Sequence, residues 1–496
     1  MRRIDHACRR AIVGTVLALA AVGHFATMPA AQAADQKPNF IVINIDDLGY
    51  ADIGPFGATK QKTPNLDRMA AEGRKLMSHY AAPVCSPSRA ALMTGCYPKR
   101  VLPIPGVLFP AGAVGLNPEE KTVAEYLKDL GYATACFGKW HLGDQPEFMP
   151  TSQGFDTYYG IPFSNDMGPG SEGSKSNFGE KLPKPKAATP DESEGEVGLR
   201  GNAQPPLPLV ENLKTVERVG PAEQATVTRR YTERAVKFID DHKAKPFFIY
   251  LPHNAVHFPI YPDAPFRGRS QGGLRGDWIE EVDWSVGQVL DAVRKAGISE
   301  RTLVIFTSDN GGPTNQQANN APYRGGKGST LEGGIRVCTI AWWPGKIAAG
   351  TATMEMTSMM DVLPTLVSLA GGKVSADRKL DGLDVSQVLT GPADARSPRQ
   401  EFCYFRGPKL EAVRKGPWKL HLADGALYNV VDDPGEATNV VSAHPSEVEQ
   451  LQAVAVAMAA DLGDKNDSGP GVHKLGRVDN PQPWISHDGK FRELDP

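Results

Sequence analysis

Four apolar runs in this chain are each followed closely by polar side chains that can bind or react. Near-continuous apolar runs are typical of strands that are buried on both faces of a sheet. In open α/β sheets the ligand lies beyond the carboxyl ends of the strands. The sequence therefore predicts one shared site, built from the residues that follow these runs: Asp46 and Asp47 after 39–45, Asp309 and Asn310 after 302–307, Lys139 and His141 after 132–137, and His253 and His257 after 246–251.

Amphipathic segments separate the runs, as expected when helices connect parallel strands. We therefore predict an α/β fold, with a large mixed, mostly parallel sheet sandwiched by helices. The spacing of apolar residues predicts these helices near 64–72, 123–130, 278–293 and 361–370. Further along, the sequence predicts a short antiparallel sheet from 412–421 and 425–430, a helix near 447–462, and a final polar stretch that forms a surface tail.

A chain of 496 residues exceeds one ordinary domain. We expect a large domain over residues 35–395 and a smaller C-terminal α+β subdomain, with the tail, over residues 396–496. Residues 167–212 are rich in Gly, Pro, Lys and Glu and are predicted to form a long variable loop inserted in the large domain.

The first 34 residues have the pattern of an export signal. Arginines precede an apolar run from Ala11 to Val22 that is too short to span a bilayer, and Ala31-Gln32-Ala33 offers a cleavage site. We expect residues 1–34 to be removed and the protein to be exported, to a bacterial periplasm or as a secreted protein, without a membrane anchor. An uncleaved anchor is the alternative. The formal net charge of −3 does not indicate a nucleic-acid partner.

The chain contains six cysteines, of which Cys8 lies in the predicted signal. Their wide spacing shows no metal-binding finger pattern. Apart from Cys85, which is considered below, the remaining cysteines could be free and buried or paired in an oxidising compartment: Cys96, Cys136, Cys338 and Cys403.

The residues after two of the runs supply only hard oxygen donors. Asp46 and Asp47 would point to opposite faces of a regular strand, and they can converge only where the strand ends. Asp309 and Asn310 follow another strand. Carboxylate and amide oxygens without thiolate or imidazole suit Ca²⁺ or Mg²⁺ rather than zinc. A lone Asp-Asp pair is more often a turn or a cap, and the second cluster favours a metal site.

Residues 85–89 have the sequence Cys-Ser-Pro-Ser-Arg and run into a segment that predicts a helix. Pro87 lacks an N–H and has a fixed φ, so it suits the first turn of that helix. Cys85 would then lie just before the helix N-terminus, where backbone N–H groups and the helix dipole favour an anion. Arg89 adds a permanent positive charge one turn later. A buried cysteine beside a proline turn is the alternative.

Further cationic side chains could act on an anion held there. Lys139 and His141 are two residues apart, so on an extended chain they face the same way. Prolines on both sides of His253 and His257 argue against a regular helix, and we take His257 as the catalytic candidate and His253 as its support. Lys327 lies in a Gly-rich segment, which could carry it close to an anion or simply form a flexible turn.

With these residues assembled, the chain resembles the type I sulfatases of the alkaline phosphatase superfamily, and within them the arylsulfatase A group. The resemblance covers nearly all of the chain after residue 34. It implies an alkaline phosphatase-like catalytic domain. The sequence departs from the family pattern between Met167 and Asn212, and we expect this long loop to lie beside the substrate entrance, where such loops set specificity. It rests on Ile45-Asp46-Asp47-Leu48-Gly49-Tyr50, the Cys85 segment, Gly138-Lys139-Trp140-His141-Leu142-Gly143, Gly160-Ile161-Pro162-Phe163-Ser164-Asn165-Asp166, Ser308-Asp309-Asn310-Gly311-Gly312, and Gly325-Gly326-Lys327-Gly328 leading to Glu332-Gly333-Gly334.

The resemblance implies that Cys85 is oxidised after translation to Cα-formylglycine, by a formylglycine-generating enzyme. It makes Ser164 a contact of the sulfate or of the formylglycine. It also implies one bound Ca²⁺, with Mg²⁺ as the other possibility, and as its ligands Asp46, Asp47, Asp309, Asn310 and the modified residue 85.

The same resemblance implies roles in a reaction. The aldehyde would be hydrated, and one hydroxyl would attack sulfur while the metal, Arg89, Lys139 and Lys327 stabilise the charge. His257, with Lys327, would protonate the departing alcohol. His141 would take a proton from the second hydroxyl, so that sulfate leaves and the aldehyde is restored.

We therefore expect a sulfuric ester hydrolase that converts aryl or carbohydrate sulfates to an alcohol and inorganic sulfate, with a small-molecule or glycan sulfate ester as substrate. Two alternatives stay open. A related enzyme could act on phosphonate monoesters or phosphodiesters, because sulfuryl and phosphoryl groups are both tetrahedral and alike to a cationic site. An inactive protein with unmodified Cys85 could instead bind sulfated glycans. The natural ester and the oligomeric state are not assigned.

Overall fold

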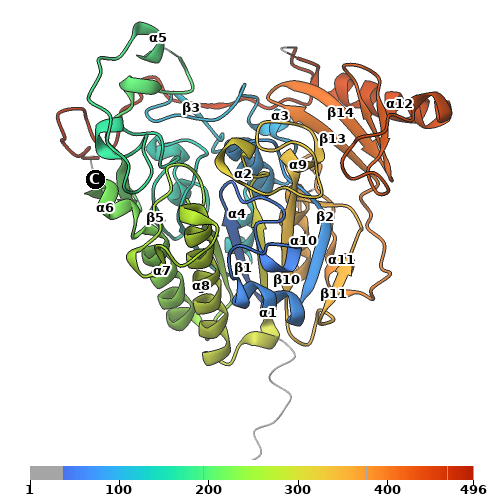
Figure 1. The fold of residues 1–496 in the computed structure, drawn as a ribbon, viewed down its shortest axis with the longest axis horizontal. Helices are drawn as coiled ribbons and strands as arrows, with labels where there is room; N and C mark the ends of the chain where they lie inside the picture. Colours follow the sequence, from blue (N-terminus) through green and yellow to red (C-terminus); the bar gives the residue numbers. More distant parts are fainter. Residues whose placement is uncertain (1–36, 194, 376, 466, 495–496) are drawn as a thin grey trace, which may run out of the picture. The chain divides into compact units, whose positions relative to one another are not determined.

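A mixed sheet of 11 strands runs through the computed structural model of the protein (Figure 1). The structure describes residues 37–193, 195–375, 377–465 and 467–494, so the predicted export signal lies outside the described part. Along the sheet the strand order is β11-β2-β10-β9-β1-β8-β4-β5-β6-β7, and β12 pairs with β2. The strands are β1 Asn39–Ile45, β2 Arg74–Tyr80, β4 Ala133–Phe137, β5 Thr157–Gly160, β6 Pro208–Glu211, β7 Lys214–Arg218, β8 Phe247–Pro252, β9 Thr302–Ser308, β10 Arg336–Trp342, β11 Thr351–Thr353 and β12 Thr357–Ser358.

Parallel pairing dominates the middle of this sheet. β1 pairs in parallel with both β8 and β9, and β4 pairs in parallel with both β8 and β5. β10 joins β9 and β2 in antiparallel fashion, and β6 and β7 extend the other edge as antiparallel strands. The predicted α/β fold with a large mixed, mostly parallel sheet is therefore confirmed. Because β9, β1, β8 and β4 run in the same direction, the polar residues that follow them meet at one edge.

Alternate residues of β1 contribute to two hydrophobic cores. Phe40 and Val42 belong to one core, whereas Ile41, Ile43 and Ile45 belong to the other, and all five are fully buried. Each such side chain stabilises the fold by roughly 1.5–3 kcal/mol. Helices cover both faces: α1 (Pro64–Glu72), α7 (Val227–His242) and α8 (Gly273–Lys295) on one, and α2 (Cys85–Thr94), α4 (Val123–Asp129) and α10 (Val362–Leu369) on the other (Figure 1).

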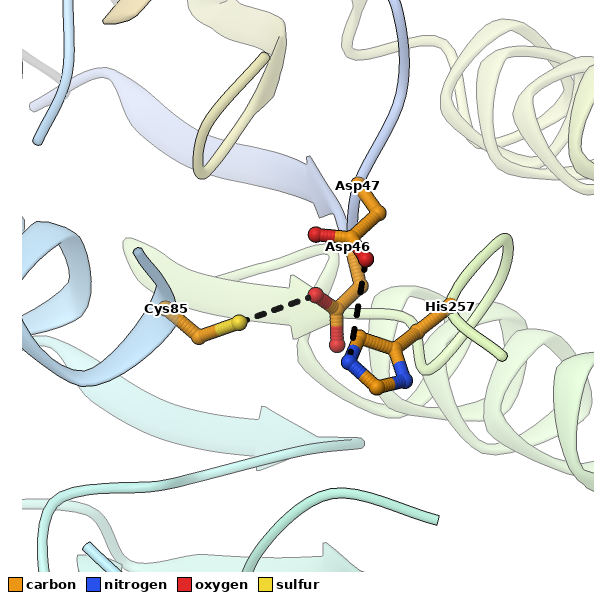
Figure 2. Close-up of side chains that lie close together, drawn as sticks. All are labelled: Asp46, Asp47, Cys85 and His257. Atoms are coloured by element: carbon orange, nitrogen blue, oxygen red, sulfur yellow. Dashed lines mark hydrogen bonds and ion pairs between the residues drawn. The ribbon is translucent and has the colours of Figure 1, made fainter. Parts of the chain in front are cut away.

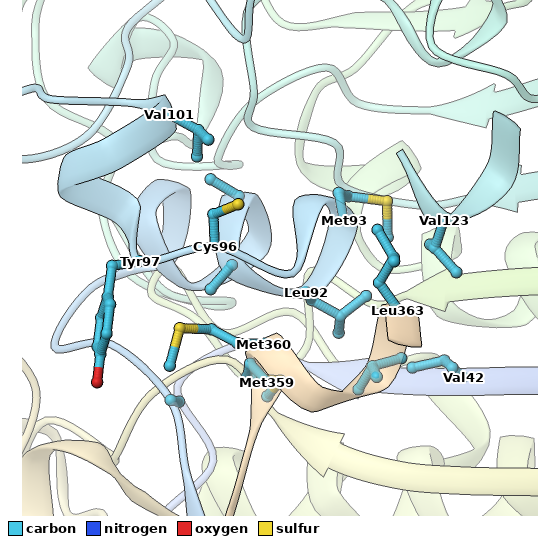
Figure 3. Packing of buried hydrophobic residues seen from close by; sticks show 14 of the residues in the cluster. Val42, Leu92, Met93, Cys96, Tyr97, Val101, Val123, Met359, Met360 and Leu363 are labelled. Atoms are coloured by element: carbon cyan, nitrogen blue, oxygen red, sulfur yellow. The ribbon is translucent and has the colours of Figure 1, made fainter. Parts of the chain in front are cut away.

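Helix α2 is buried along its whole length. Leu92 lies beside Leu363 of α10 and near Val42 of β1, within one hydrophobic cluster (Figure 3). Pro87 lies in the first turn, as the sequence predicts. Cys85 is the first residue of the helix, one position later than its expected place just before the N-terminus. Packing of α2 against the sheet therefore fixes where Cys85 lies.

The C-terminal part forms a second, antiparallel sheet in the order β13 (Glu401–Arg406), β14 (Lys409–Lys415), β15 (Trp418–His421) and β16 (Leu427–Asn429). Helix α12 (Pro445–Leu462) lies against β14, and an antiparallel sheet followed by a helix agrees with the prediction. The run at 412–421, expected as one strand, is divided between β14 and β15, which pair with each other across a turn at Gly416 and Pro417. The last stretch is not a surface tail, because β17 (Gly476–Arg477) pairs with β3 (Val114–Gly115). Trp484 is also buried, and its Nε1 donates to the carbonyl oxygen of Asp144 at 2.6 Å. One large apolar side chain anchors an otherwise polar stretch.

The segment 167–212 is mostly irregular, as expected, but it does not form a loop throughout. Residues 208–211 are β6, which pairs with β5 on one side and with the edge strand β7 on the other. A four-residue strand that begins with proline gives too weak a pattern to be recognised in the sequence. The remaining helices are short: α3 Pro98–Val101, α5 Pro190–Ser193, α6 Pro221–Gln224, α9 Glu332–Ile335 and α11 Ser386–Thr390.

The cysteines of the described part are free thiols, so the alternative of disulfide pairing is not what the structure contains. All are buried: Cys85, Cys96, Cys136, Cys338 and Cys403. Within the described residues, no helix has both the length and the apolar character that crossing a bilayer requires. Contacts group residues 37–496 as one unit, and the boundary proposed at residue 395 stays a prediction.

Gly138, directly after β4, is expected to be intolerant of a side chain. Its φ is 133°, and a Cβ atom would lie 1.8 Å from the carbonyl oxygen of Pro252. Gly131 also has a positive φ, but a Cβ there would meet nothing within 4 Å. We expect Gly131→Ala to cost about 1–2 kcal/mol from the backbone conformation alone, and Gly138→Ala to cost clearly more, because β4 must also move away from β8.

Thermal unfolding followed by circular dichroism compares the two variants with the parent protein. Equal unfolding midpoints for Gly131→Ala and Gly138→Ala would contradict the close approach of β4 and β8 at this point.

Candidate active site

The side chains that follow β1 and β9 meet at the edge of the sheet, as predicted. The two strands pair in register up to their last residues. Asp47 has a φ of 62°, which breaks the strand alternation that would otherwise separate it from Asp46. The backbone N–H of Asp47 donates to Asp309 Oδ1 at 3.3 Å, and Asn310 Nδ2 donates to Asp47 Oδ1 at 2.7 Å. These four residues form one buried polar cluster.

Cys85 faces this cluster from the N-terminus of α2 (Figure 2). Only 1% of its surface is exposed. Its Sγ lies 3.3 Å from Asp46 Oδ1, and Lys327 Nζ lies 3.6 Å from the same sulfur. The helix start adds the partial positive charge of unpaired N–H groups. The residue is therefore held where carboxylates, an ammonium group and a helix dipole converge.

Arg89 links α2 to two of the strand ends. Its Nε and Nη2 donate to Asp309 Oδ2 at 3.0 and 2.7 Å, and its Nη1 donates to the carbonyl oxygen of Lys139 at 2.7 Å. Lys139 Nζ forms an ion pair with Asp46 Oδ2. Lys327 Nζ lies 2.8 Å from Asp47 Oδ1. Each predicted cation therefore contacts one of the predicted carboxylates.

His141 is held in a strained turn with one ring nitrogen left without a partner. It has a φ of 64°, its N–H donates to the carbonyl oxygen of Pro162 at 2.8 Å, and its Nε2 lies 2.9 Å from the carbonyl oxygen of Leu108. Nε2 must carry the proton to donate to a carbonyl, so Nδ1 is left as an acceptor. Nδ1 is buried and has no hydrogen-bond partner among the described residues.

His257 lies on the opposite side of the cluster and points toward Asp46 and Asp47 (Figure 2). Its Nε2 lies 3.7 Å from Asp47 Oδ2, and Ser164 Oγ lies 3.2 Å from its Nδ1. His253, expected as its support, points elsewhere. The Nε2 of His253 lies 3.1 Å from Ser285 Oγ, which belongs to α8. The two histidines are not on a helix, as the flanking prolines predict.

The formal charges of the buried side chains balance. Three carboxylates face three cations, which are Asp46, Asp47 and Asp309 against Arg89, Lys139 and Lys327. Burial by itself raises the pKa of Asp46, but the charges of Lys139, His257 and Arg89 outweigh burial and hold that pKa below its ordinary value. A divalent cation added to this balanced set would leave it with an excess of positive charge, which suits an anionic ligand.

The net shift of the pKa is in the opposite direction for the thiol of Cys85. Burial, together with the charges of Asp309 and Asp46, raises the pKa of Cys85 well above its ordinary value. An unmodified thiol in this position would stay protonated and would be a poor nucleophile. Burial also lowers the pKa of His141, with Lys139 and Arg89 acting in the same direction, so its imidazole is neutral.

The donor atoms of the site fit a metal ion. One ligand atom from each of Asp46, Asp47, Cys85 and His257 lies within 4.8 Å of the others (Figure 2). Asn310 Oδ1 is buried without a hydrogen-bond partner among the described residues, and a buried oxygen in this state costs free energy unless a cation or a donor reaches it. Carboxylate and amide oxygens are the ligands that Ca²⁺ and Mg²⁺ prefer.

A pocket of about 500 Å³ leads from the surface to Cys85. Its inner end is lined by five residues that the sequence singled out, namely Cys85, His141, Ser164, His257 and Lys327. The predicted site residues therefore lie either in this pocket or in the charged cluster beneath it.

Arg275 is a buried residue of the site that the sequence did not reveal. From α8, its Nη2 donates to the carbonyl oxygen of Asp47 at 2.6 Å and to Asp52 Oδ2 at 2.9 Å, while its Nη1 donates to the carbonyl oxygen of Val256 at 3.2 Å. Arg275 therefore fixes the position of two turns that face the cluster, the turn at Asp47 and the turn at Val256. The available signal was an arginine at apolar-face spacing, three positions before Trp278.

Comparison with known proteins identifies the family. A family model described as Sulfatase matches residues 38–372, which is more than half of the chain. The chain belongs to the sulfatase family. It is therefore an enzyme of the family that hydrolyses sulfate esters.

Individual sulfatases agree with this membership. The N-acetylgalactosamine-6-sulfatase of Canis lupus familiaris is 39% identical over 405 residues, covering 79% of this chain and 73% of that protein. Arylsulfatase A of Homo sapiens is 38% identical over 452 residues, covering 84% and 85%. A crystal structure of Ps i-CgsB in complex with k-i-k-neocarrahexaose is similar with a TM-score of 0.71 and 29% identity, covering 88% of this chain and 95% of that one.

Removal and addition of divalent ions should change the stability of this sulfatase. We expect Ca²⁺ or Mg²⁺ added to chelator-treated protein to raise the unfolding midpoint, with about 2.7 kcal/mol of stabilisation at an ion concentration near 100 times Kd. Asn310→Ala should lose most of that rise, because it removes a buried oxygen that has no hydrogen-bond partner in the described part of the chain.

Asn39→Ala is the matched control, since Asn39 is a buried amide at the opposite end of β1. It should lower the midpoint but keep the full rise on addition of the ion. Scanning calorimetry measures all three proteins. An equal rise in the Asn310→Ala variant and the parent would argue against a metal ligand at Asn310.

Proposed function

We propose that this sulfatase hydrolyses sulfate monoesters of aromatic or carbohydrate alcohols, with formylglycine derived from Cys85 as its nucleophile and Ca²⁺ as its bound ion. The observation that carries the proposal is the position of Cys85. It lies at a helix N-terminus and at the inner end of a pocket, 3.3 Å from Asp46 and 3.6 Å from Lys327. A sulfate group there would meet a nucleophile and cations together.

Conversion of Cys85 to formylglycine would change the chemistry of this position. The hydrated aldehyde carries two hydroxyl groups in place of one protonated thiol. One hydroxyl can attack sulfur and the other can later release sulfate, whereas an ester on a plain serine would have no such internal route. The change also replaces a soft sulfur by oxygen, which makes the donor set uniform with the carboxylates of Asp46 and Asp47.

Binding of the sulfate group is assigned to side chains that line the pocket. Lys327 and Ser164 can donate to the sulfate oxygens, and Lys139 and Arg89 hold positive charge directly beneath. These groups are fixed before substrate enters, because each is already hydrogen-bonded or ion-paired. Preorganised donors of this kind stabilise charge that develops on the sulfuryl oxygens during transfer.

Two histidines are suited to move the protons. His257, on one side of the pocket, is assigned as the acid that protonates the departing alcohol, with Lys327 beside it. His141 is assigned as the base that takes a proton from the second hydroxyl of residue 85, because its Nδ1 is an acceptor without a partner. Different histidines therefore handle the two proton transfers. His257 gives a proton to the departing alcohol, and His141 takes a proton from the second hydroxyl of residue 85.

The ion would be held by the oxygens of Asp46, Asp47, Asp309 and Asn310, together with residue 85. When bound it would supply positive charge that lowers the pKa of a hydroxyl on residue 85 and polarises the sulfuryl group. Mg²⁺ could serve in its place, since the same oxygen donors bind it.

The pattern of residues 1–34 supports export, to a periplasm or as a secreted protein. The carbohydrate class of substrate is supported by the names of similar proteins, one of them an N-acetylgalactosamine-6-sulfatase and another crystallised with a neocarrahexaose. A formylglycine-generating enzyme is the maturation partner that the mechanism requires.

Mass spectrometry of the tryptic peptide 76–89, from protein made in its own host, tests the nucleophile. We expect a peptide lighter by the exchange of CH₂SH for CHO at Cys85, and an intact thiol would overturn the mechanism. Cys85→Ala should lower kcat on an aryl sulfate about 10³-fold or more. Cys338→Ala, which removes another buried thiol, should leave kcat close to that of the parent.

A paired assay tests the reaction. The modified enzyme should cleave nitrophenyl sulfate with a higher kcat/KM than a nitrophenyl phosphonate monoester. The reverse order would instead support a phosphonate or phosphodiester hydrolase. Binding of sulfated glycans without release of sulfate, in protein with an intact thiol, would support the non-catalytic alternative.

A further inference from the structure

The outer part of the active-site pocket consists of residues to which the mechanism gives no role. A pocket of about 500 Å³ is much larger than a sulfate group needs and is of the size that holds a whole small ligand. The alcohol part of the ester must therefore lie against this outer part. It has an apolar wall and two charged side chains, formed by Pro105, Val107, Phe109, Met167, Val197, Asp166 and Arg200.

Arg200 is brought to the pocket by backbone pairing of the 167–212 segment. The N–H of Phe109 donates to the carbonyl oxygen of Val197 at 2.7 Å, and the N–H of Leu199 donates to the carbonyl oxygen of Pro110 at 2.8 Å. These bonds tie the chain before Arg200 to the chain that lines the pocket. Main-chain hydrogen bonds therefore fix the backbone beside Arg200, and its side chain starts from a defined position at the pocket.

The guanidinium group of Arg200 lies over the ring of Phe109, 5.1 Å from its centroid. Within the described residues, no carboxylate comes within ion-pair distance of it and no acceptor takes a hydrogen bond from its side chain. Other arginines differ, since Arg218 pairs with Glu172 and Arg234 with Glu211. A guanidinium resting on an aromatic ring keeps its planar fork of N–H donors free for an anion.

Asp166 supplies the opposite kind of group. Asp166 also lines the pocket, and its Oδ1 is buried without a hydrogen-bond partner among the described residues. An anion would be repelled there, whereas a hydroxyl group could donate to it. Phe109 and Met167 add apolar surface to the same pocket. A ligand that fits these side chains has a hydroxyl donor, an apolar face and an anionic substituent. A sugar ring with a negatively charged group has all three.

We propose that Arg200, Asp166 and Phe109 form a subsite for a saccharide that carries a second negative charge, a carboxylate, besides the ester that is cleaved. This inference rests on the proposed hydrolysis of sulfate esters and narrows its substrate class. Arg200 binds the second anion, and Asp166 accepts a hydrogen bond from a ring hydroxyl.

Three ligands test the subsite with formylglycine-containing enzyme. Nitrophenyl sulfate reports the reaction without a second charge. Sulfated disaccharides that contain a uronic acid, and the same disaccharides with the carboxylate reduced to an alcohol, differ only in that charge. They are measured as substrates and as competitive inhibitors of nitrophenyl sulfate hydrolysis, so that binding is scored even where turnover is slow.

For the parent enzyme we expect the carboxylate form to bind about 10- to 100-fold more tightly than the reduced form, the range of a charge-assisted hydrogen bond. Arg200→Gln should remove that difference while leaving kcat/KM on nitrophenyl sulfate within about twofold. Arg200→Lys should retain part of it. Lys186→Gln is the matched control, because Lys186 is an exposed cation of the same segment that does not line the pocket.

Equal binding of the two disaccharide forms by the parent enzyme would overturn the proposal, and so would an equal loss on all three ligands in Arg200→Gln. A parent enzyme that cleaves nitrophenyl sulfate but does not distinguish the disaccharides would refute the subsite alone. A formylglycine-containing enzyme that cleaves no sulfate ester would refute the proposed function itself.

Discussion

The contacts of one buried guanidinium hold the active site together. Arg89 extends from the helix that begins with Cys85, forms two hydrogen bonds to Asp309 after β9, and donates to the main chain at Lys139 after β4. A buried arginine is stable only when its charge is matched and its donors are used. Asp309 supplies the matching charge, and Asp309 and the carbonyl oxygen of Lys139 accept the hydrogen bonds. The same contacts fix the start of α2 beside the ends of β9 and β4. Removal of either partner would leave an unmatched charge in the interior.

The C-terminal sheet reaches the same site through a second set of buried charges. Lys419 of β15 donates to the carbonyl oxygen of Thr330 at 2.8 Å and contacts Glu332 at 3.0 Å, just beyond the loop that carries Lys327. The N–H of Glu332 in turn donates to Glu436 at 2.8 Å. The small sheet therefore fixes residues 330–332, where the loop that carries Lys327 ends.

The sequence allowed prediction of the parts of the fold that depend on local pattern. The run at 39–45 is β1, and the cluster after it lies where strand direction requires. Prediction failed where the cause is tertiary. Trp484 is buried because β17 returns to β3, and Arg275 matters because two distant turns expose carbonyl oxygens to it. These contacts join residues that are far apart in the sequence, so no local spacing predicts them. Arg200 could not be predicted for the same reason, because it reaches the pocket by backbone pairing with the chain around Phe109.

The burial of Cys85 has a consequence for how the enzyme is made. Only 1% of its surface is exposed, and the pocket of about 500 Å³ that reaches it has the size of a small-ligand site, so the folded chain offers no access to a modifying enzyme. On the proposed mechanism, oxidation must then come before folding, while residues 85–89 are still an extended peptide. The rate of folding would thus compete with the rate of modification, and a molecule that folds first would be trapped as a stable but inactive thiol form.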